Sequence, residues 1–202
     1  MSVSLVSAPV RQHEVPVFPA IKSIGVIGSR SLTFHMCEKV GDVVEDLLSR
    51  KYHIASGGAI GADQFVVEKL LRIGQSDHCT VYSPWKNYSG FPVKVRVMMR
   101  QFRDYGGSII WGPVFGKEPE GLVRLALLHR NERLVEACYG LVAFITGDSR
   151  GSIFTIKKAA QKRMPLVVFP IDCHLPEIPF VKWVQLRCGG CWENCFKAVY
   201  LK

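Results

Sequence analysis

The sequence predicts an α/β protein in which a mainly parallel β-sheet is covered by helices on both faces. Between about residue 20 and residue 170, short apolar runs alternate with longer segments whose apolar residues recur at helical spacing. The runs are nearly continuous in apolar residues, as expected of parallel strands buried on both faces. Glycine-rich stretches follow several runs, where a parallel strand would turn into the next helix.

The elements follow from this pattern in chain order. After the first apolar run, Met36, Val40, Val43 and Leu47 recur at helical spacing with charged residues between them, which predicts an amphipathic helix. A second strand, glycine loop and helix repeat the unit, and the alternation continues to Pro170. We therefore predict a Rossmann-like, doubly wound sheet. The predicted strands are 24–27, 52–55, 79–82, 108–111, 141–145 and 166–169, and the predicted helices are 36–48, 62–73, 94–103, 122–138 and 152–163.

Composition changes at both ends of this core. We expect residues 1–20 to form a flexible arm and residues 21–170 to form the ligand-binding domain. Residues 171–202 are rich in Pro, Cys and Trp, and the strand–helix alternation stops there. We expect this part to be a Cys-rich extension packed on the domain, with one edge strand near residues 181–186.

Charge favours an anionic partner. The chain has 202 residues, with 26 Lys and Arg against 17 Asp and Glu, a net charge of +9. A field of that sign attracts polyanions such as nucleic acids and phosphate-bearing nucleotides. Hydrophobic residues at 48% and charged residues at 21% disfavour disordered and fibrous classes.

Targeting signals are not evident in the sequence. The first twenty residues lack a basic segment before an apolar run and contain three prolines, and no later apolar run reaches the length of a membrane-spanning helix. We therefore expect a cytoplasmic protein without a membrane partner. Seven cysteines without regular spacing fit reduced thiols better than a disulfide framework. A homo-oligomer is compatible with the sequence.

Three loops share one chemical logic, since each follows a predicted strand, opens a helix and is rich in glycine and small hydroxyl residues. Glycine allows close approach of the backbone to an anion, and the first N–H groups of a helix point toward it. Arg30 could add a charged contact to a phosphate. Asp63 could accept a hydrogen bond from a ribose or base, or could simply stabilise the helix dipole. The candidate residues are Gly28, Ser29 and Arg30 in the first loop, Ser56, Gly57, Gly58, Ala59, Gly61, Ala62 and Asp63 in the second, and Gly147, Ser149, Gly151 and Ser152 in the third.

Topology predicts that these loops meet. In an open parallel sheet all loops after strands lie at the carboxyl edge, and ligands bind where the strand order reverses. We therefore expect one anion site, for a nucleotide or a nucleic acid, across the three loops.

The same loops carry a family resemblance. The first strand ends in GSR, the second loop reads SGGAIGAD, and HRNERLVEACYGLVAFITGDSRGSIFTIKKAAQKRMPLVVFP follows. Over residues 22–170 these motifs resemble the DNA-processing protein A (Smf) family of the Rossmann-like superfamily that also holds the LOG phosphoribohydrolases. The resemblance implies single-stranded DNA binding in aid of recombinase loading, and it adds Arg130 and Asn131 to the ligand-lining positions. We therefore predict a protein that binds single-stranded DNA or RNA without chemistry of its own.

Two other functions stay open. The chain could be a LOG-like binder, carrier or sensor of a nucleotide derivative without chemistry of its own. It could also be a nucleotide phosphoribohydrolase, but the stretch that resembles the LOG motif P-G-G-x-G-T-x-x-E has Thr155 where that family has its glutamate. A threonine cannot ionise near neutral pH to serve as that acid or base. We therefore expect no catalytic residue of this kind.

Two clusters outside the loops offer further chemistry. Cys188, Cys191 and Cys195 form a partial ligand set for a structural zinc ion, and the alternative is a group of reduced thiols packed beside tryptophans. Ahead of the basic 94–103 segment, the aromatic residues of the 85–91 loop could stack on bases, or could pack onto the edge of the sheet. These aromatic residues are Trp85, Tyr88 and Phe91.

Overall fold

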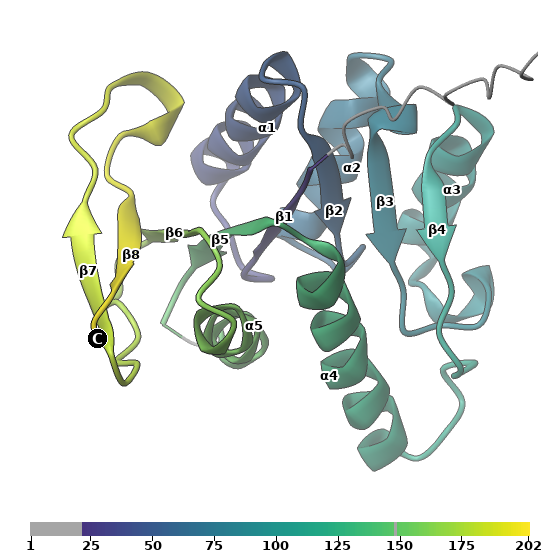
Figure 1. Ribbon diagram of the computed structural model, residues 1–202. Helices are drawn as coiled ribbons and strands as arrows, with labels where there is room; N and C mark the ends of the chain where they lie inside the picture. Colours follow the sequence, from purple (N-terminus) through teal and green to yellow (C-terminus); the bar gives the residue numbers. More distant parts are fainter. Residues whose placement is uncertain (1–21, 148) are drawn as a thin grey trace, which may run out of the picture.

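The computed structural model describes residues 22–147 and 149–202, so the predicted arm at residues 1–20 and Asp148 lie outside the described residues. Within that part of the chain, the strands form one eight-stranded sheet in the order β4-β3-β2-β1-β5-β6-β8-β7 (Figure 1). Strands β1 to β6 pair in parallel, whereas β8 pairs antiparallel with both β6 and β7. The predicted Rossmann-like α/β fold is therefore confirmed.

The bounds of the elements agree closely with the predicted pattern as far as β6. The strands are β1 (Ser23–Gly28), β2 (His53–Ser56), β3 (Cys79–Tyr82), β4 (Ser108–Ile110), β5 (Gly140–Ile145), β6 (Leu166–Pro170), β7 (Val181–Gln185) and β8 (Phe196–Tyr200). The helices are α1 (Phe34–Ser49), α2 (Ala62–Arg72), α3 (Val93–Asp104), α4 (Glu120–Ala137) and α5 (Arg150–Gln161), with short 3₁₀ turns η1 (Ser76–His78), η2 (Tyr88–Gly90) and η3 (Gly190–Trp192).

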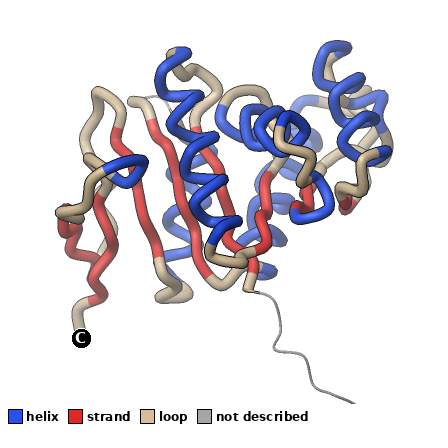
Figure 2. Tube along the Cα trace, turned by 90° about the horizontal axis from the view of Figure 1, so that it is seen from above, coloured by secondary structure: helices blue, strands red, loops and turns tan. Residues whose placement is uncertain are grey.

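Alternating residues of the central strands build a core on each face of the sheet. On β5, Val142 and Phe144 join the cluster that contains α1, α2 and α3, while Leu141, Ala143 and Ile145 join the cluster that contains α4 and α5. Helices accordingly lie on both sides of the strand layer (Figure 2). Because β5 is completely buried, its sequence shows a continuous apolar run instead of a period of two.

The strand order reverses between β1 and β5, which are neighbours in parallel register. The chain leaves β1 for α1 on one face and leaves β5 for α5 on the other. The loops that follow these two strands therefore diverge from the same point of the carboxyl edge, which is where open α/β sheets bind ligands.

One edge strand was predicted after residue 170, but the structure has two strands there. The extension supplies two antiparallel strands, and the later one, β8, lies between β6 and β7 (Figure 1). Trp192 anchors the loop between them, because its indole N–H donates to Asp46 Oδ2 of α1 at 2.8 Å. The extension thus continues the central sheet.

None of the helices in the described ranges is long and apolar enough to cross a membrane.

Candidate functional site

The first and third glycine loops meet through their hydroxyl groups. Ser29, after β1, and Ser149, before α5, are both buried and their side-chain oxygens are in hydrogen-bond contact. The backbone N–H of Thr146 donates to Ser29 Oγ at 2.7 Å and to Ser149 Oγ at 3.0 Å. These hydrogen bonds join the loops that follow β1 and β5, and they fix the start of α5 beside the first loop.

The second loop packs against the first through backbone contacts. The N–H of Ala62, the first residue of α2, donates to the carbonyl oxygen of Ser29 at 3.1 Å. Gly61 has a φ of 94°, and a Cβ there would overlap Ser29 O and lie 2.5 Å from Arg30 Cα. Only glycine fits at this junction, because it has no side chain and tolerates positive φ.

A buried ion pair lies behind the second loop. Asp63 of α2 is 3% exposed and Arg130 of α4 is 6% exposed, and Asp63 Oδ2 lies 3.4 Å from Arg130 Nη1. The same carboxylate oxygen accepts the N–H of Ala59 at 3.3 Å. Burial raises the pKa of the Asp63 carboxyl, and the Arg130 charge opposes that shift. One carboxylate oxygen of Asp63 therefore both accepts a hydrogen bond from the second loop and pairs with Arg130.

The remaining glycines fall into two groups. A Cβ at Gly28 would lie 2.5 Å from Phe144 O, and a Cβ at Gly58 would lie 2.7 Å from a Val81 methyl group. At Gly147 and Gly151, by contrast, no surrounding heavy atom of the described chain lies within 4 Å of such a Cβ. The first group is required by packing, whereas the third loop keeps open space beside its backbone, as a bound phosphate would need.

The start of α5 is held by neighbouring side chains. Asn131 of α4 donates from Nδ2 to the carbonyl oxygen of Gly151 at 3.4 Å. The hydroxyl of Thr155 donates to the same oxygen at 2.9 Å, and Thr155 is 1% exposed. Ser152 is also buried. Thr155 thus satisfies a helix carbonyl and has no acidic group to offer to a substrate.

Positive side chains remain exposed around these loops. Arg30 extends from the first loop and Arg150 begins α5, and both are exposed. Lys86, in the loop after β3, is exposed and lies 4.8 Å from the ring centroid of Phe115, which is 44% exposed. Lys86 and Phe115 were not predicted from the sequence, although Phe115 stands in a Gly- and Pro-rich loop after a strand, which is a detectable signal.

The aromatic residues of the 85–91 loop mostly pack inward. Phe91 is 3% exposed, and Tyr88 meets Trp111 edge to face with 4.9 Å between ring centroids. Trp85 lies against Gly90. Of the two interpretations of this loop, the structure therefore shows the packed one.

The cysteines of the extension differ in exposure. Cys188 is exposed, whereas Cys195 is buried. Burial, together with the neighbouring Cys188, raises the pKa of the Cys195 thiol to about 11. Among residues 22–147 and 149–202, no group of three or more His, Cys, Asp or Glu side chains is placed to hold a metal ion. Structural zinc remains a prediction for these thiols.

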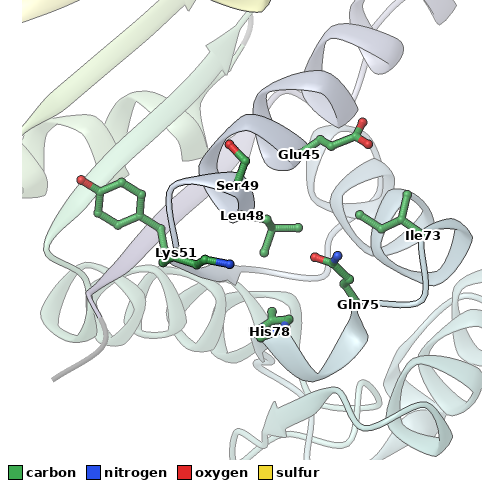
Figure 3. Close-up of a pocket in the computed structure, with 8 residues that line it drawn as sticks. Glu45, Leu48, Ser49, Lys51, Ile73, Gln75 and His78 are labelled. Atoms are coloured by element: carbon green, nitrogen blue, oxygen red, sulfur yellow. The ribbon is translucent and has the colours of Figure 1, made fainter. Parts of the chain in front are cut away.

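A separate cleft of about 420 Å³ lies away from the glycine loops, between the C-terminal ends of α1 and α2 and the turn η1 (Figure 3). Leu48 and Ile73 contribute apolar surface, and Lys51, Gln75 and His78 contribute polar groups. The carboxyl ends of α1 and α2 face this region, and the negative ends of their helix dipoles disfavour an anion there.

Comparison with known proteins identifies the lineage. Residues 14–178 match the family model of DNA recombination-mediator protein A. The chain belongs to this family. Comparison with curated protein sequences gives no match.

Solved structures share the fold of this family member. DNA processing protein A from Streptococcus pneumoniae is 22% identical with a TM-score of 0.57, over 77% of this chain and 52% of that chain. The Helicobacter pylori protein, described with a unique single-stranded DNA binding mode, is 20% identical with a TM-score of 0.60, over 78% of this chain and 68% of that chain. A molybdenum cofactor binding protein from Rippkaea orientalis is 14% identical with a TM-score of 0.54, over 75% and 78% of the two chains. The chain thus spans about half the length of the S. pneumoniae protein.

Proposed function

We propose that this chain binds single-stranded DNA or RNA across the loops at the carboxyl edge of its sheet, with the third loop as the main phosphate seat. The observation that carries the proposal is the open space beside Gly147 and Gly151 at the start of α5, next to the exposed Arg30 and Arg150. Membership in the DNA recombination-mediator family supports a nucleic acid as the ligand.

The charges and the exposed ring suit a single strand in particular. Arg30, Arg150 and Lys86 could contact phosphates of one strand, because they follow β1, β5 and β3 at the same edge of the sheet, with Arg150 as the first residue of α5. Phe115 could stack on an unpaired base, an interaction that every base permits and that a duplex does not offer. A single strand is therefore favoured over a duplex.

A salt titration tests this proposal. Fluorescence anisotropy with an oligonucleotide of about fifteen residues is expected to show binding at low salt, with log K falling against log salt by about 0.7 per phosphate contact and by about 3 for four contacts. Arg30→Ala is expected to weaken binding and to reduce the slope by about one contact. Arg72→Ala is the matched control, because Arg72 is exposed at the far end of α2.

The competing function is a carrier or sensor of a nucleotide derivative. A compact ligand would show a shallow salt dependence and would be displaced by a mononucleotide. If no oligonucleotide binds at low salt while a mononucleotide raises the melting temperature, the nucleic-acid proposal is wrong and the carrier function replaces it. An RNA oligonucleotide of the same sequence separates DNA preference from general single-strand binding.

A further inference from the structure

Arg130 of α4 packs against the second loop. Its Nη1 lies 3.4 Å from Asp63 Oδ2, and the same carboxylate oxygen accepts the N–H of Ala59 within the loop. A Cβ at Gly57 would overlap the Arg130 guanidinium. The guanidinium thus packs directly on the loop backbone, and the loop reaches α4 through both a steric and an ionic contact.

The next residue of α4 contacts the third loop. Asn131 donates to the carbonyl oxygen of Gly151, in the first turn of α5. Two consecutive residues of one rigid helix therefore hold two loops that are far apart in the sequence. Helix α4 thus links the second and third loops, in addition to the contacts that both loops make with Ser29 of the first loop.

Direct contact of Arg130 with a phosphate is disfavoured by this geometry. Arg130 is 6% exposed, and turning it outward would leave Asp63 as a buried carboxylate without its partner. The pair is also incompletely satisfied, because Asp63 Oδ1 and Arg130 Nε are buried without a hydrogen-bond partner among the described protein atoms. A buried ion pair that leaves two polar atoms without partners contributes little to stability, so the contacts of the pair with Ala59 and Gly57 point to a geometric role.

We infer that Arg130 is a positioning residue, which acts through Asp63 and Gly57 to hold the second loop at a fixed place beside the third, so that both can contact one nucleic-acid strand. This inference rests on the proposed function for its ligand. In this inference the Arg130 guanidinium pairs with Asp63 inside the protein, and exposed residues such as Arg30 make the phosphate contacts.

The test uses a double variant, Asp63→Asn with Arg130→Met, in the full chain. Removing both charges together with little change of volume avoids an uncompensated buried charge, so the variant is expected to fold. Its affinity for the single-stranded oligonucleotide is expected to fall about tenfold, as for coupled neighbouring residues. The salt slope is expected to stay at the wild-type value, whereas Arg30→Ala flattens it by about 0.7.

Gly57→Ala gives a second, independent perturbation, because its methyl group displaces the guanidinium without altering any charge. We expect it to reproduce the loss of affinity with the slope unchanged. A flattened slope in the double variant would show that Arg130 contacts phosphate, and wild-type affinity would show that the pair is merely structural. Either outcome overturns the inference.

Hydrogen exchange in the ligand-free protein separates this inference from the proposed function. Segment 57–61 is expected to exchange about tenfold faster in the double variant, because the loop opens locally once its anchor is lost. If wild-type protein binds no oligonucleotide but segment 57–61 does exchange faster, the proposed function fails and the positioning role stands. Unchanged exchange in this segment overturns the positioning role whatever the ligand.

Discussion

Gly61→Ala is expected to destabilise the protein strongly, because this glycine joins the first two loops. Its φ of 94° and ψ of −136° lie in a region that side chains avoid, at a cost of about 1–3 kcal/mol. The added methyl group would also overlap Ser29 O and crowd the Arg30 backbone. Forced overpacking of this kind costs a further 1–3 kcal/mol or so, which brings the expected loss to about 2–6 kcal/mol.

Gly151→Ala is the matched control on the third loop. Gly151 lies in the first turn of α5, and the space around it is open. Alanine is favoured over glycine in a helix by about 0.5–1 kcal/mol, so this variant is expected to be as stable as the wild type or slightly more stable. Its affinity for single-stranded DNA is nevertheless expected to fall, because the methyl group fills the space proposed for a phosphate.

Urea unfolding followed by circular dichroism measures both variants, and thermal melting checks them. For a chain of this size the loss at Gly61 corresponds to a fall in melting temperature of about 5–20 °C. If the free energy of unfolding of Gly61→Ala lay within about 0.5 kcal/mol of the wild-type value, the contact between the loops would be refuted, because changes that small are typical of exposed surface substitutions. A large loss of stability in Gly151→Ala would refute the open third loop.

Three further outcomes concern thiols, metal and catalysis. Iodoacetamide at mildly alkaline pH is expected to label the exposed Cys188 first. Cys195 is expected to react only after unfolding, because burial and the neighbouring Cys188 raise the pKa of its thiol to about 11. Equal labelling rates of the two cysteines in the native protein, measured by mass spectrometry, would contradict the burial of Cys195. Elemental analysis of protein purified without chelators decides between zinc and packed thiols: a full equivalent of zinc would show that the loop of the extension rearranges around the metal, whereas under about half an equivalent would favour reduced thiols packed in the extension. Incubation with nucleoside monophosphates is expected to release no free base, because Thr155 offers no ionisable group; release seen by chromatography would show that another residue supplies the acid.

The arrangement of strands and helices was largely predictable because each βα unit carries its own local signal. Strand β3 was predicted at its observed bounds, and α1, α2 and α4 within two residues, because apolar periodicity reflects burial directly. Strand β8 escaped prediction, although FKAVY alternates between half-buried and exposed residues. Its place between β6 and β7 depends on a long-range antiparallel pairing that no local pattern contains.

The positions of the three loops in the fold were predictable, but the contacts of their residues were not. The switch-point rule locates the three loops at the carboxyl edge as soon as the parallel order is known. Burial of Arg130 could not be foreseen, because an arginine on a helix is usually exposed and its partner Asp63 lies on another helix. Lys86 and Phe115 were missed because their proximity comes from two loops that follow different strands.

The sequence by itself determined the α/β class, the order of the central elements and the positions at which glycine is needed, since all three follow from local periodicity and backbone sterics. Only the tertiary structure decided what each glycine is for. Gly57 makes room for a guanidinium from α4 and Gly61 for the backbone of the first loop, whereas Gly151 leaves its space open. A missing Cβ looks the same in sequence whether the space belongs to a neighbouring segment or to a ligand, and only the positions of distant residues tell the two apart.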